Sequence, residues 1–380
     1  MKKNLTLILG LFILMACTNK TEPEEAKTLS GLKKSNFTTE LDGKQTNLFV
    51  LKNSAGMEIC ITNYGGRIVS IMVPDRDGAM QDVVLGFDSI ADYINIPNNF
   101  GTTVGRYANR IANGKMIIDG IEYQLPQNNL NHTIHGGDDN FAIKVFDAKQ
   151  IDNQTVEMSY TSKDGESGFP GNLTSKVTMT LTENHAIDIK YEATTDKKTV
   201  INLTNHSFFN LSGNPENTVL DYELTINADS FTPIDHTSIT TGEIINVEGT
   251  DLDFRTPTIV GDRIDNYNYD QLKYANGYDH NWVLNNPGDI STAVASVYNS
   301  ETGIELNVYT TEPGIQVYTG NFLNGTVTGK REINYKPRTG ICLEPQKYPN
   351  APNNPDWPSA YLSPGETYTS RTIYQFTVRE

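Results

Sequence analysis

Cysteine is scarce in this chain, and its scarcity excludes a disulfide framework. The 380 residues include three cysteines, Cys17, Cys60 and Cys342. Small exported domains that depend on disulfides contain several cysteine pairs. Cys60 and Cys342 both lie in apolar, strand-like runs, so we expect two buried free thiols. A bridge between them stays an alternative for an exported protein.

Basic residues are also in deficit. Lysine and arginine total 30 against 46 aspartates and glutamates, which gives a formal net charge of −16. An acidic surface repels nucleic acid and anionic lipid headgroups. The composition therefore argues against a nucleic-acid partner and predicts a neutral small molecule instead.

The apolar run near the N-terminus is too short to span a bilayer permanently, which takes ~20 residues. It extends from Leu7 to Met15, follows two lysines, and leads into Met15-Ala-Cys17. A charged start, a short apolar run and a small residue before the cleavage point are typical of a secretory signal. The cysteine directly after that point indicates a bacterial lipoprotein with Cys17 lipidated. A plain signal peptide with an incidental Cys17 is the alternative.

A polar, charged stretch follows, from Thr18 to Lys27, and cannot bury apolar area. We therefore expect a signal peptide at residues 1–16, a flexible tether at 17–32 and a single domain at 33–380. The protein is then an exported lipoprotein, on the periplasmic side or at the cell surface. Its contact with the membrane would be the N-terminal lipid alone, and we expect a monomer.

Sustained helical periodicity is missing from the domain. Short runs rich in β-branched and aromatic residues are separated by Asp-Gly and Asn-Gly turns, which favour antiparallel hairpins. A large all-β unit of this length favours a sandwich over a small barrel, and Asp88 to Ile94 could form one helical turn. The predicted strands include Thr46–Lys52, Met57–Thr62, Gln154–Ser162, Leu173–Leu181, Ile187–Thr194, Val219–Asn227, Ile304–Thr310 and Thr372–Val378.

One predicted strand carries an ionisable side chain at its centre. In Leu203-Thr-Asn-His-Ser-Phe-Phe-Asn-Leu211 the side chains alternate between two faces. Leu203, Phe209 and Leu211 fall on a face that reads as core, whereas His206 falls on a polar face. A half-buried histidine with a structural role is the alternative interpretation.

Several further motifs accompany this strand in a fixed order. With it, they closely resemble the aldose 1-epimerases, or galactose mutarotases, from about Lys33 to the C-terminus. The resemblance implies one large antiparallel β-sandwich, often called a supersandwich, with a sugar cleft across a concave sheet. It also implies sugar-anomer interconversion without a cofactor. The motifs are Gly105-Arg-Tyr-Ala-Asn-Arg-Ile111, Ile134-His-Gly-Gly137, Gly277-Tyr-Asp-His-Asn281, Pro313-Gly-Ile-Gln-Val-Tyr-Thr-Gly320 and Ile341-Cys-Leu-Glu-Pro-Gln346.

Anomer interconversion needs a base for the anomeric hydroxyl and an acid for the ring oxygen. The resemblance implies Glu344 as the base. Ile341 and Leu343 share one strand face, Cys342 and Glu344 share the other, and we expect Pro345 to end regular pairing. A solvated glutamate at a sheet edge is the alternative.

The resemblance implies His206 as the acid and His135 as its support near the ring oxygen. On the alternation, Asn202, Thr204 and Asn210 are the side chains placed to orient His206. A nearby carboxylate would raise the pKa of His206. We expect a bell-shaped pH–rate profile whose basic limb disappears in a His206→Asn protein.

The sugar hydroxyls need side chains that donate and accept hydrogen bonds. The resemblance implies Asn109, Arg110, Asp279 and Gln316 for this task. Arg106 is expected to bridge backbone or carboxylates, and His280 is expected to be structural. Trp357 and Tyr361 either stack on a sugar or fill a loop. His132 and His135 lack a nearby third ligand, so no metal site is predicted.

Three other functions compete with a mutarotase for free hexoses such as galactose and glucose. A hexose phosphate epimerase would want more cationic residues at the cleft, which an acidic chain disfavours. A carbohydrate-binding lipoprotein without catalysis could have lost Glu344 or His206, yet both are present. A lyase or hydrolase would want a pair of carboxylates that is not evident.

Overall fold

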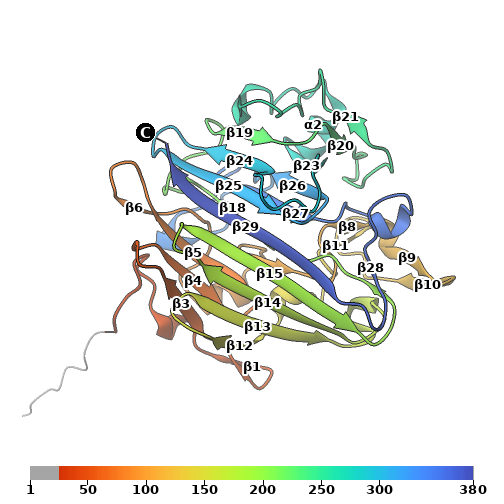
Figure 1. The fold of residues 1–380 in the computed structure, drawn as a ribbon, viewed down its shortest axis with the longest axis horizontal. Helices are drawn as coiled ribbons and strands as arrows, with labels where there is room; N and C mark the ends of the chain where they lie inside the picture. Colours follow the sequence, from red (N-terminus) through yellow and green to blue (C-terminus); the bar gives the residue numbers. More distant parts are fainter. Residues whose placement is uncertain (1–24, 380) are drawn as a thin grey trace, which may run out of the picture.

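A nine-stranded antiparallel sheet dominates the computed structural model, which describes residues 25–379. Figure 1 shows its longest strand, β29, running in blue through the middle of the sheet. The signal peptide and Cys17 predicted above lie outside the described residues. In spatial order the strands are β12 (Asp147–Gln150), β13 (Thr155–Ser162), β14 (Leu173–Leu181), β15 (Ala186–Thr195), β29 (Tyr368–Val378), β25 (Ile304–Thr310), β24 (Ala295–Tyr298), β19 (Glu223–Ile226) and β22 (Thr258–Ile259).

Side chains of this sheet alternate cleanly between core and solvent. Along β14 every second residue is buried, and β25 shows the same pattern. This is the period-two signature of a strand with one wet face. The predicted ranges Leu173–Leu181 and Ile304–Thr310 are confirmed to the residue, whereas Val219–Asn227 shortens to Glu223–Ile226.

A six-stranded sheet forms the second layer and carries the site described below. Its order is β18 (Phe208–Phe209), β27 (Ile341–Gln346), β26 (Gly314–Tyr318), β23 (Asp279–Val283), β20 (Ser230–Thr232) and β21 (Ile245–Asn246). Ile341 and Leu343 of β27 belong to the same apolar core as residues of β14 and β25. The Tyr374 hydroxyl of β29 donates to the Leu343 carbonyl at 2.7 Å. The predicted all-β sandwich is confirmed.

Pro345 does not end the pairing of β27, contrary to the prediction. It lies opposite Ile315, and the strand continues to Gln346. Proline lacks only the amide hydrogen, so its carbonyl and its neighbours can still pair.

Smaller sheets complete the fold. A four-stranded sheet contains β3 (Leu48–Lys52), β4 (Glu58–Thr62), β5 (Arg67–Pro74) and β6 (Met80–Asp82). The two-stranded pairs are β1 (Glu40–Leu41) with β2 (Lys44–Gln45), β7 (Thr102–Val104) with β17 (Thr204–His206), β8 (Arg110–Ile111) with β11 (Thr133–Ile134), β9 (Lys115–Ile118) with β10 (Ile121–Gln124), and β16 (Thr199–Val200) with β28 (Tyr361–Leu362).

Two short α-helices occur in the described chain, α1 (Ile90–Asn95) and α2 (Asp270–Ala275). The first matches the helical turn expected near residues 88–94 and begins where Ser89 Oγ accepts from the Asp92 amide. The second was not predicted. Asn276 ends it with a positive φ of 53°. Asn276-Gly277, one of the Asn-Gly pairs expected to form turns between strands, is therefore a helix end instead. Neither helix of residues 25–379 is long and apolar enough to cross a membrane.

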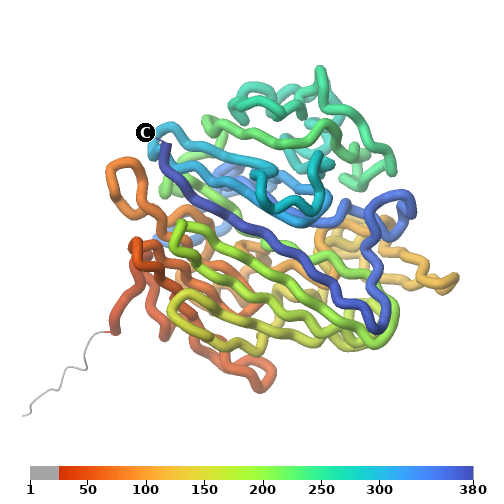
Figure 2. The backbone as a smooth tube through the Cα atoms, viewed as in Figure 1, coloured from red at the N-terminus to blue at the C-terminus, as the bar shows by residue number. Residues whose placement is uncertain are grey.

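The folded part begins earlier than the predicted residue 33. Leu32 is 2% exposed and belongs to the same apolar cluster as Phe37. The Leu29 amide donates to Glu58 Oε1 of β4 at 2.7 Å. In Figure 2 the described chain begins in red at the lower left, beside the other red and orange segments of its N-terminal part. The last residues of the predicted tether therefore belong to the fold, because Leu32 is buried and Leu29 contacts a buried carboxylate.

Candidate active site

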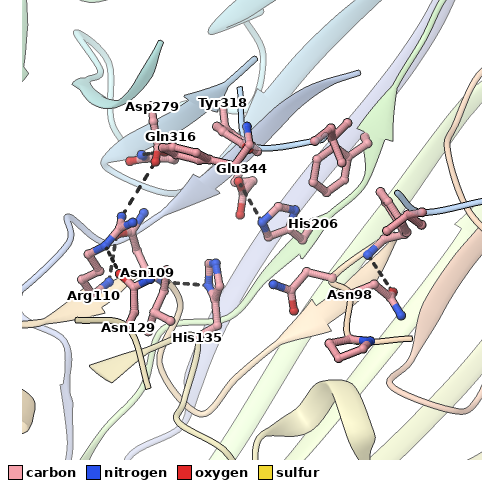
Figure 3. Close-up of a pocket in the computed structure, with 18 of the residues that line it drawn as sticks. Asn98, Asn109, Arg110, Asn129, His135, His206, Asp279, Gln316, Tyr318 and Glu344 are labelled. Atoms are coloured by element: carbon pink, nitrogen blue, oxygen red, sulfur yellow. Dashed lines mark hydrogen bonds and ion pairs between the residues drawn. The ribbon is translucent and has the colours of Figure 1, made fainter. Parts of the chain in front are cut away.

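A cavity of ≈ 450 Å³ opens on the face of the six-stranded sheet that points away from the core (Figure 3). All seven residues predicted for the sugar site line it, and they come from six separate stretches of sequence. Those residues are Asn109, Arg110, His135, His206, Asp279, Gln316 and Glu344.

Strand register brings three of the polar side chains together. Gln316 of β26 lies directly opposite Glu344 of β27, and Tyr318 lies opposite both Cys342 and Asp279. Side chains of directly opposed residues share a sheet face a few ångströms apart. The floor of the cavity is thus set by pairing between strands far apart in sequence.

Glu344 is almost fully buried and faces His206. It is 2% exposed, and its Oε1 lies 3.7 Å from His206 Nε2. Figure 3 shows the two side chains pointing toward each other. Glu344 Oε2 has no hydrogen-bond partner among the described residues. Burial raises the pKa of Glu344 well above its usual value, the charge of Asp279 adds to this, and Arg110 opposes it.

The His206 ring is held on four sides. Phe208 stacks on it at a centroid distance of 5.0 Å, and the His135 ring meets it edge-on at 5.1 Å. Its Nδ1 lies 3.6 Å from Cys342 Sγ, while Nε2 faces Glu344. The imidazole is therefore fixed with Nε2 toward the carboxylate.

Two predictions about His206 are wrong. None of the three expected side chains orients the ring. Asn202 and Asn210 bind backbone groups of other segments, and Thr204 Oγ1 makes no hydrogen bond among the described residues. Cys342 contacts the ring in their place. Burial also lowers the pKa of His206 to about 4, where a rise was expected. Desolvation of the imidazolium outweighs the attraction of a carboxylate that is itself reluctant to ionise.

His135 is positioned by a reciprocal contact with Asn109. The Asn109 amide donates to His135 Nδ1 at 3.2 Å, and the His135 amide donates to the Asn109 carbonyl at 3.1 Å. Both residues have positive φ, 64° and 51°, a strained conformation for non-glycine residues that occurs often at functional sites. Because Nδ1 accepts, the ring proton of neutral His135 rests on Nε2. Burial keeps the pKa of His135 well below its usual value, with the His206 and Arg110 charges adding to the effect.

A chain of polar contacts forms the opposite wall. Gln316 Nε2 donates to Asp279 Oδ1 at 2.7 Å, and Arg110 Nη1 lies 3.9 Å from Asp279 Oδ2. Arg110 Nε donates to Asn129 Oδ1 at 3.1 Å. Burial raises the pKa of Asp279, and Arg110 and Gln316 oppose that rise. The wall presents donors and acceptors in alternation, as a polyol requires.

Comparison with known proteins bears on this arrangement. The family model described as Aldose 1-epimerase matches residues 47–375. The galactose mutarotase of Sus scrofa is 42% identical over 322 residues, covering 85% of this chain and 92% of the relative. The chain belongs to the aldose 1-epimerase family. The family resemblance inferred from the motifs is thereby confirmed.

Two other members of the aldose 1-epimerase family agree. The aldose 1-epimerase of Escherichia coli strain K12 is 36% identical over 337 residues, covering 88% of this chain and 96% of that protein. Among solved structures, an aldose epimerase homologue from C. elegans superposes with a TM-score of 0.80 at 29% identity, covering 88% of this chain and 100% of that one.

Some cavity residues of this family member were not found from its sequence. Phe208, Tyr318 and Phe322 form its aromatic walls, whereas Trp357 packs on Tyr348 in a separate apolar cluster. Alternation with Gln316 could have indicated Tyr318. Phe322 lies in an irregular segment after β26, where no periodic signal exists.

Other expectations for this family member can be compared with the fold. Arg106 donates to four backbone carbonyls and stays out of the cavity, and His280 is fully buried, so both structural interpretations are confirmed. Cys60 and Cys342 are buried free thiols, as predicted. His206, Cys342 and Glu344 place metal-ligand atoms within 4.8 Å of one another. His132 is not part of that cluster. Its Nδ1 accepts from the Asn113 amide, and its Nε2 lies 2.8 Å from Thr237 Oγ1.

Proposed function

We propose that this protein interconverts the α and β anomers of free hexoses, galactose and glucose among them. The observation that carries the proposal is the buried Glu344–His206 pair, 3.7 Å apart at the floor of a polar cavity. Ring opening of a hexose needs one base at the anomeric hydroxyl and one acid at the ring oxygen, and this pair supplies both. Positioned proton transfer of this kind accelerates reactions by about 10²–10⁴-fold.

Glu344 acts as the base and His206 as the acid. The Glu344 carboxylate takes the proton of the anomeric hydroxyl while His206 Nε2–H protonates the ring oxygen, so the C1–O5 bond breaks. The aldehyde group rotates about C1–C2. The ring then closes from the other face, with Glu344 returning a proton to the C1 oxygen and His206 taking one from O5. His135 Nε2–H donates a hydrogen bond near the ring oxygen.

Glu344 and His206 share one exchangeable proton, which is carried either by the carboxyl group or by His206 Nε2. Burial raises the pKa of Glu344 and lowers the pKa of His206, so the uncharged arrangement dominates in the free protein. The reactive arrangement, carboxylate and imidazolium, is a tautomer with the same number of protons. This charged arrangement is strongly reactive because burial disfavours both charges, so the carboxylate readily accepts a proton and the imidazolium readily donates one.

Asp279, Arg110, Gln316 and Asn109 hold the sugar hydroxyls. Among the residues described at the cavity, Arg110 is the one lysine or arginine, and it faces Asp279. A phosphate group would meet little unpaired positive charge there. The site therefore favours a neutral sugar over a sugar phosphate.

Polarimetry of freshly dissolved α-D-galactose tests the function and its base together. The wild-type protein should bring the rotation to equilibrium quickly, and Glu344→Gln, which keeps the side-chain shape, should approach the uncatalysed rate. Circular dichroism checks that the variant is folded. Equal acceleration by both proteins would remove Glu344 as the base. No acceleration by either would favour a sugar-binding protein, which calorimetric titration with galactose would then detect.

We also propose that the chain is exported as a monomeric lipoprotein anchored through Cys17. The apolar run before Met15-Ala-Cys17 supports this. Labelled palmitate should be incorporated by the wild type and not by Cys17→Ser, which should also leave the membrane fraction. Labelling of both would refute lipidation at Cys17, and sedimentation of residues 18–380 would test the monomer.

A further inference from the structure

Cys342 lies in the active site without a role in the reaction as described so far. It shares a face of β27 with Glu344, two residues on, and is fully buried. Its cross-strand neighbours are Phe208 on one side and Tyr318 on the other. Its Sγ is 3.6 Å from His206 Nδ1 and is the one side-chain hydrogen-bond partner of that ring within residues 25–379.

The reaction constrains His206 Nδ1. During ring opening the imidazolium gives up the proton on Nε2, because Nε2 is the nitrogen that faces Glu344. Nδ1 therefore keeps its hydrogen in both forms of the ring. A buried N–H without an acceptor would be costly, and the ring would escape the cost by moving the proton to Nε2. That second tautomer could not take a proton back from the sugar.

We propose that Cys342 is a positioning residue whose sulfur accepts a hydrogen bond from His206 Nδ1–H and so reserves Nε2 for proton exchange with the sugar. The proposal rests on the proposed function and adds a residue to it. Two side chains on one face of β27 would then contact the two ring nitrogens: Cys342 contacts Nδ1, and Glu344, two residues further along, contacts Nε2. Phe208 and His135 hold the plane of the ring between them.

A thiol suits this place better than a carboxylate. Burial raises the pKa of Cys342 well above its usual value, and the charges of Glu344 and Asp279 add to the rise, so the sulfur stays neutral. A neutral, weak acceptor fixes the tautomer without stabilising the imidazolium. The other ionisable groups near the ring are Arg67, His135 and Glu344. A carboxylate on Nδ1 would make His206 a weaker acid.

Nitrogen-15 NMR of the imidazole, recorded without sugar, reads the tautomer directly. In the full wild-type protein at neutral pH the neutral His206 ring should carry its proton on Nδ1. In Cys342→Ala a substantial share should move to Nε2, and Cys342→Ser should lie between the two. A wild-type ring protonated on Nε2 would overturn the proposal. This reading needs no catalysis, so it is independent of whether the proposed function holds.

Kinetics give the second readout. Loss of one weak hydrogen bond should lower kcat of Cys342→Ala by about two- to tenfold with little change in KM, and serine should partly restore kcat. An unchanged kcat at every pH would overturn the proposal. If alanine does not fold, wild type and Cys342→Ser decide by the NMR test.

Cys342→Asp and Cys342→Asn form a matched pair that separates charge from shape. The aspartate should raise the pKa of His206 and move the acid limb of the kcat profile up by about one unit or more. The asparagine should leave that limb in place. A limb that stays in place in both variants would show that position 342 does not act on Nδ1.

Discussion

The nine-stranded and six-stranded sheets bury their side chains by different rules. In β14 and β25 of the first, buried and accessible positions alternate, and seven of the nine buried side chains are apolar. In β27 of the second, all six residues are buried, although one is a glutamate and another a glutamine. A buried polar group is unfavourable unless it is paired. In β27 the buried polar face is the one that lines the cavity.

The two sheets pack around one apolar core, and they differ in what covers their other faces. Ile341 and Leu343 of β27 pack in the same cluster as Leu306 of β25 and Val177 of β14. The opposite face of β27 meets the cavity, while the opposite face of β14 meets solvent. Substitutions should therefore separate the two: the cavity face should control rate, and the shared core should control stability.

His206→Asn should give the largest effect on rate. The ring-oxygen acid is lost, so kcat for α-D-galactose should fall by about 10²–10⁴-fold. The residual rate should rise with pH and level off as Glu344 ionises, because no shared proton remains to be lost, so the basic limb disappears. Polarimetry from pH 5 to 9 measures both. A basic limb that persists in the His206→Asn protein would show that His206 is not the acid.

Leu306→Ala should lower the stability of the protein and leave the catalytic rate nearly unchanged. Leu306 is fully buried in the core between the sheets, and truncating such a residue costs about 2–5 kcal/mol of unfolding free energy. Urea denaturation measures the loss, while kcat of the folded protein should stay near wild type. The outward-facing neighbour gives the control: Asn307→Ala should change stability by less than about 0.5 kcal/mol. Equal losses in both would contradict the one-sided burial of β25.

Because His206 is buried, lowering the pH should reduce its contribution to the unfolding free energy. Its pKa is lowered from 6.5 to about 4, so protonation favours the unfolded chain. The contribution is present above pH 6.5 and is lost as the pH falls toward 4, with each pKa unit worth about 1.4 kcal/mol. The unfolding free energy of wild type minus that of His206→Asn should thus decrease by about 3 kcal/mol from pH 7 to 4. A constant difference would mean that His206 titrates normally.

Asp279→Asn should have the smallest effect of the four. The amide keeps the shape but removes the charge that pairs with Arg110 and accepts from sugar hydroxyls. Hydrogen bonds to charged groups contribute about 1.5–3 kcal/mol, so kcat/KM should fall by about 10- to 100-fold. Most of the loss should lie in KM if Asp279 grips the sugar equally throughout the reaction. A loss confined to kcat would instead place Asp279 in the proton transfer.

Much of the fold could be predicted from the sequence, and for a physical reason. Strands with one solvated face alternate, so Leu173–Leu181 and Ile304–Thr310 were found with correct bounds. Helix α2 was missed because six residues give too few periods, and Asn276-Gly277 serves hairpins and helix ends alike. The seven polar cavity residues were found through family motifs, whereas periodicity alone left structural alternatives open for them.

The sequence by itself determined the all-β class, the alternating strands of the nine-stranded sheet, the family and the seven predicted polar residues of the cavity. The tertiary structure decided how those residues act. Register across β23, β26 and β27 set Asp279, Gln316 and Glu344 on one floor. Burial reversed the expected pKa shift of His206, and Cys342 rather than an asparagine met its Nδ1. Distance and desolvation arise only when strands remote in the chain pack together, and no local pattern encodes them.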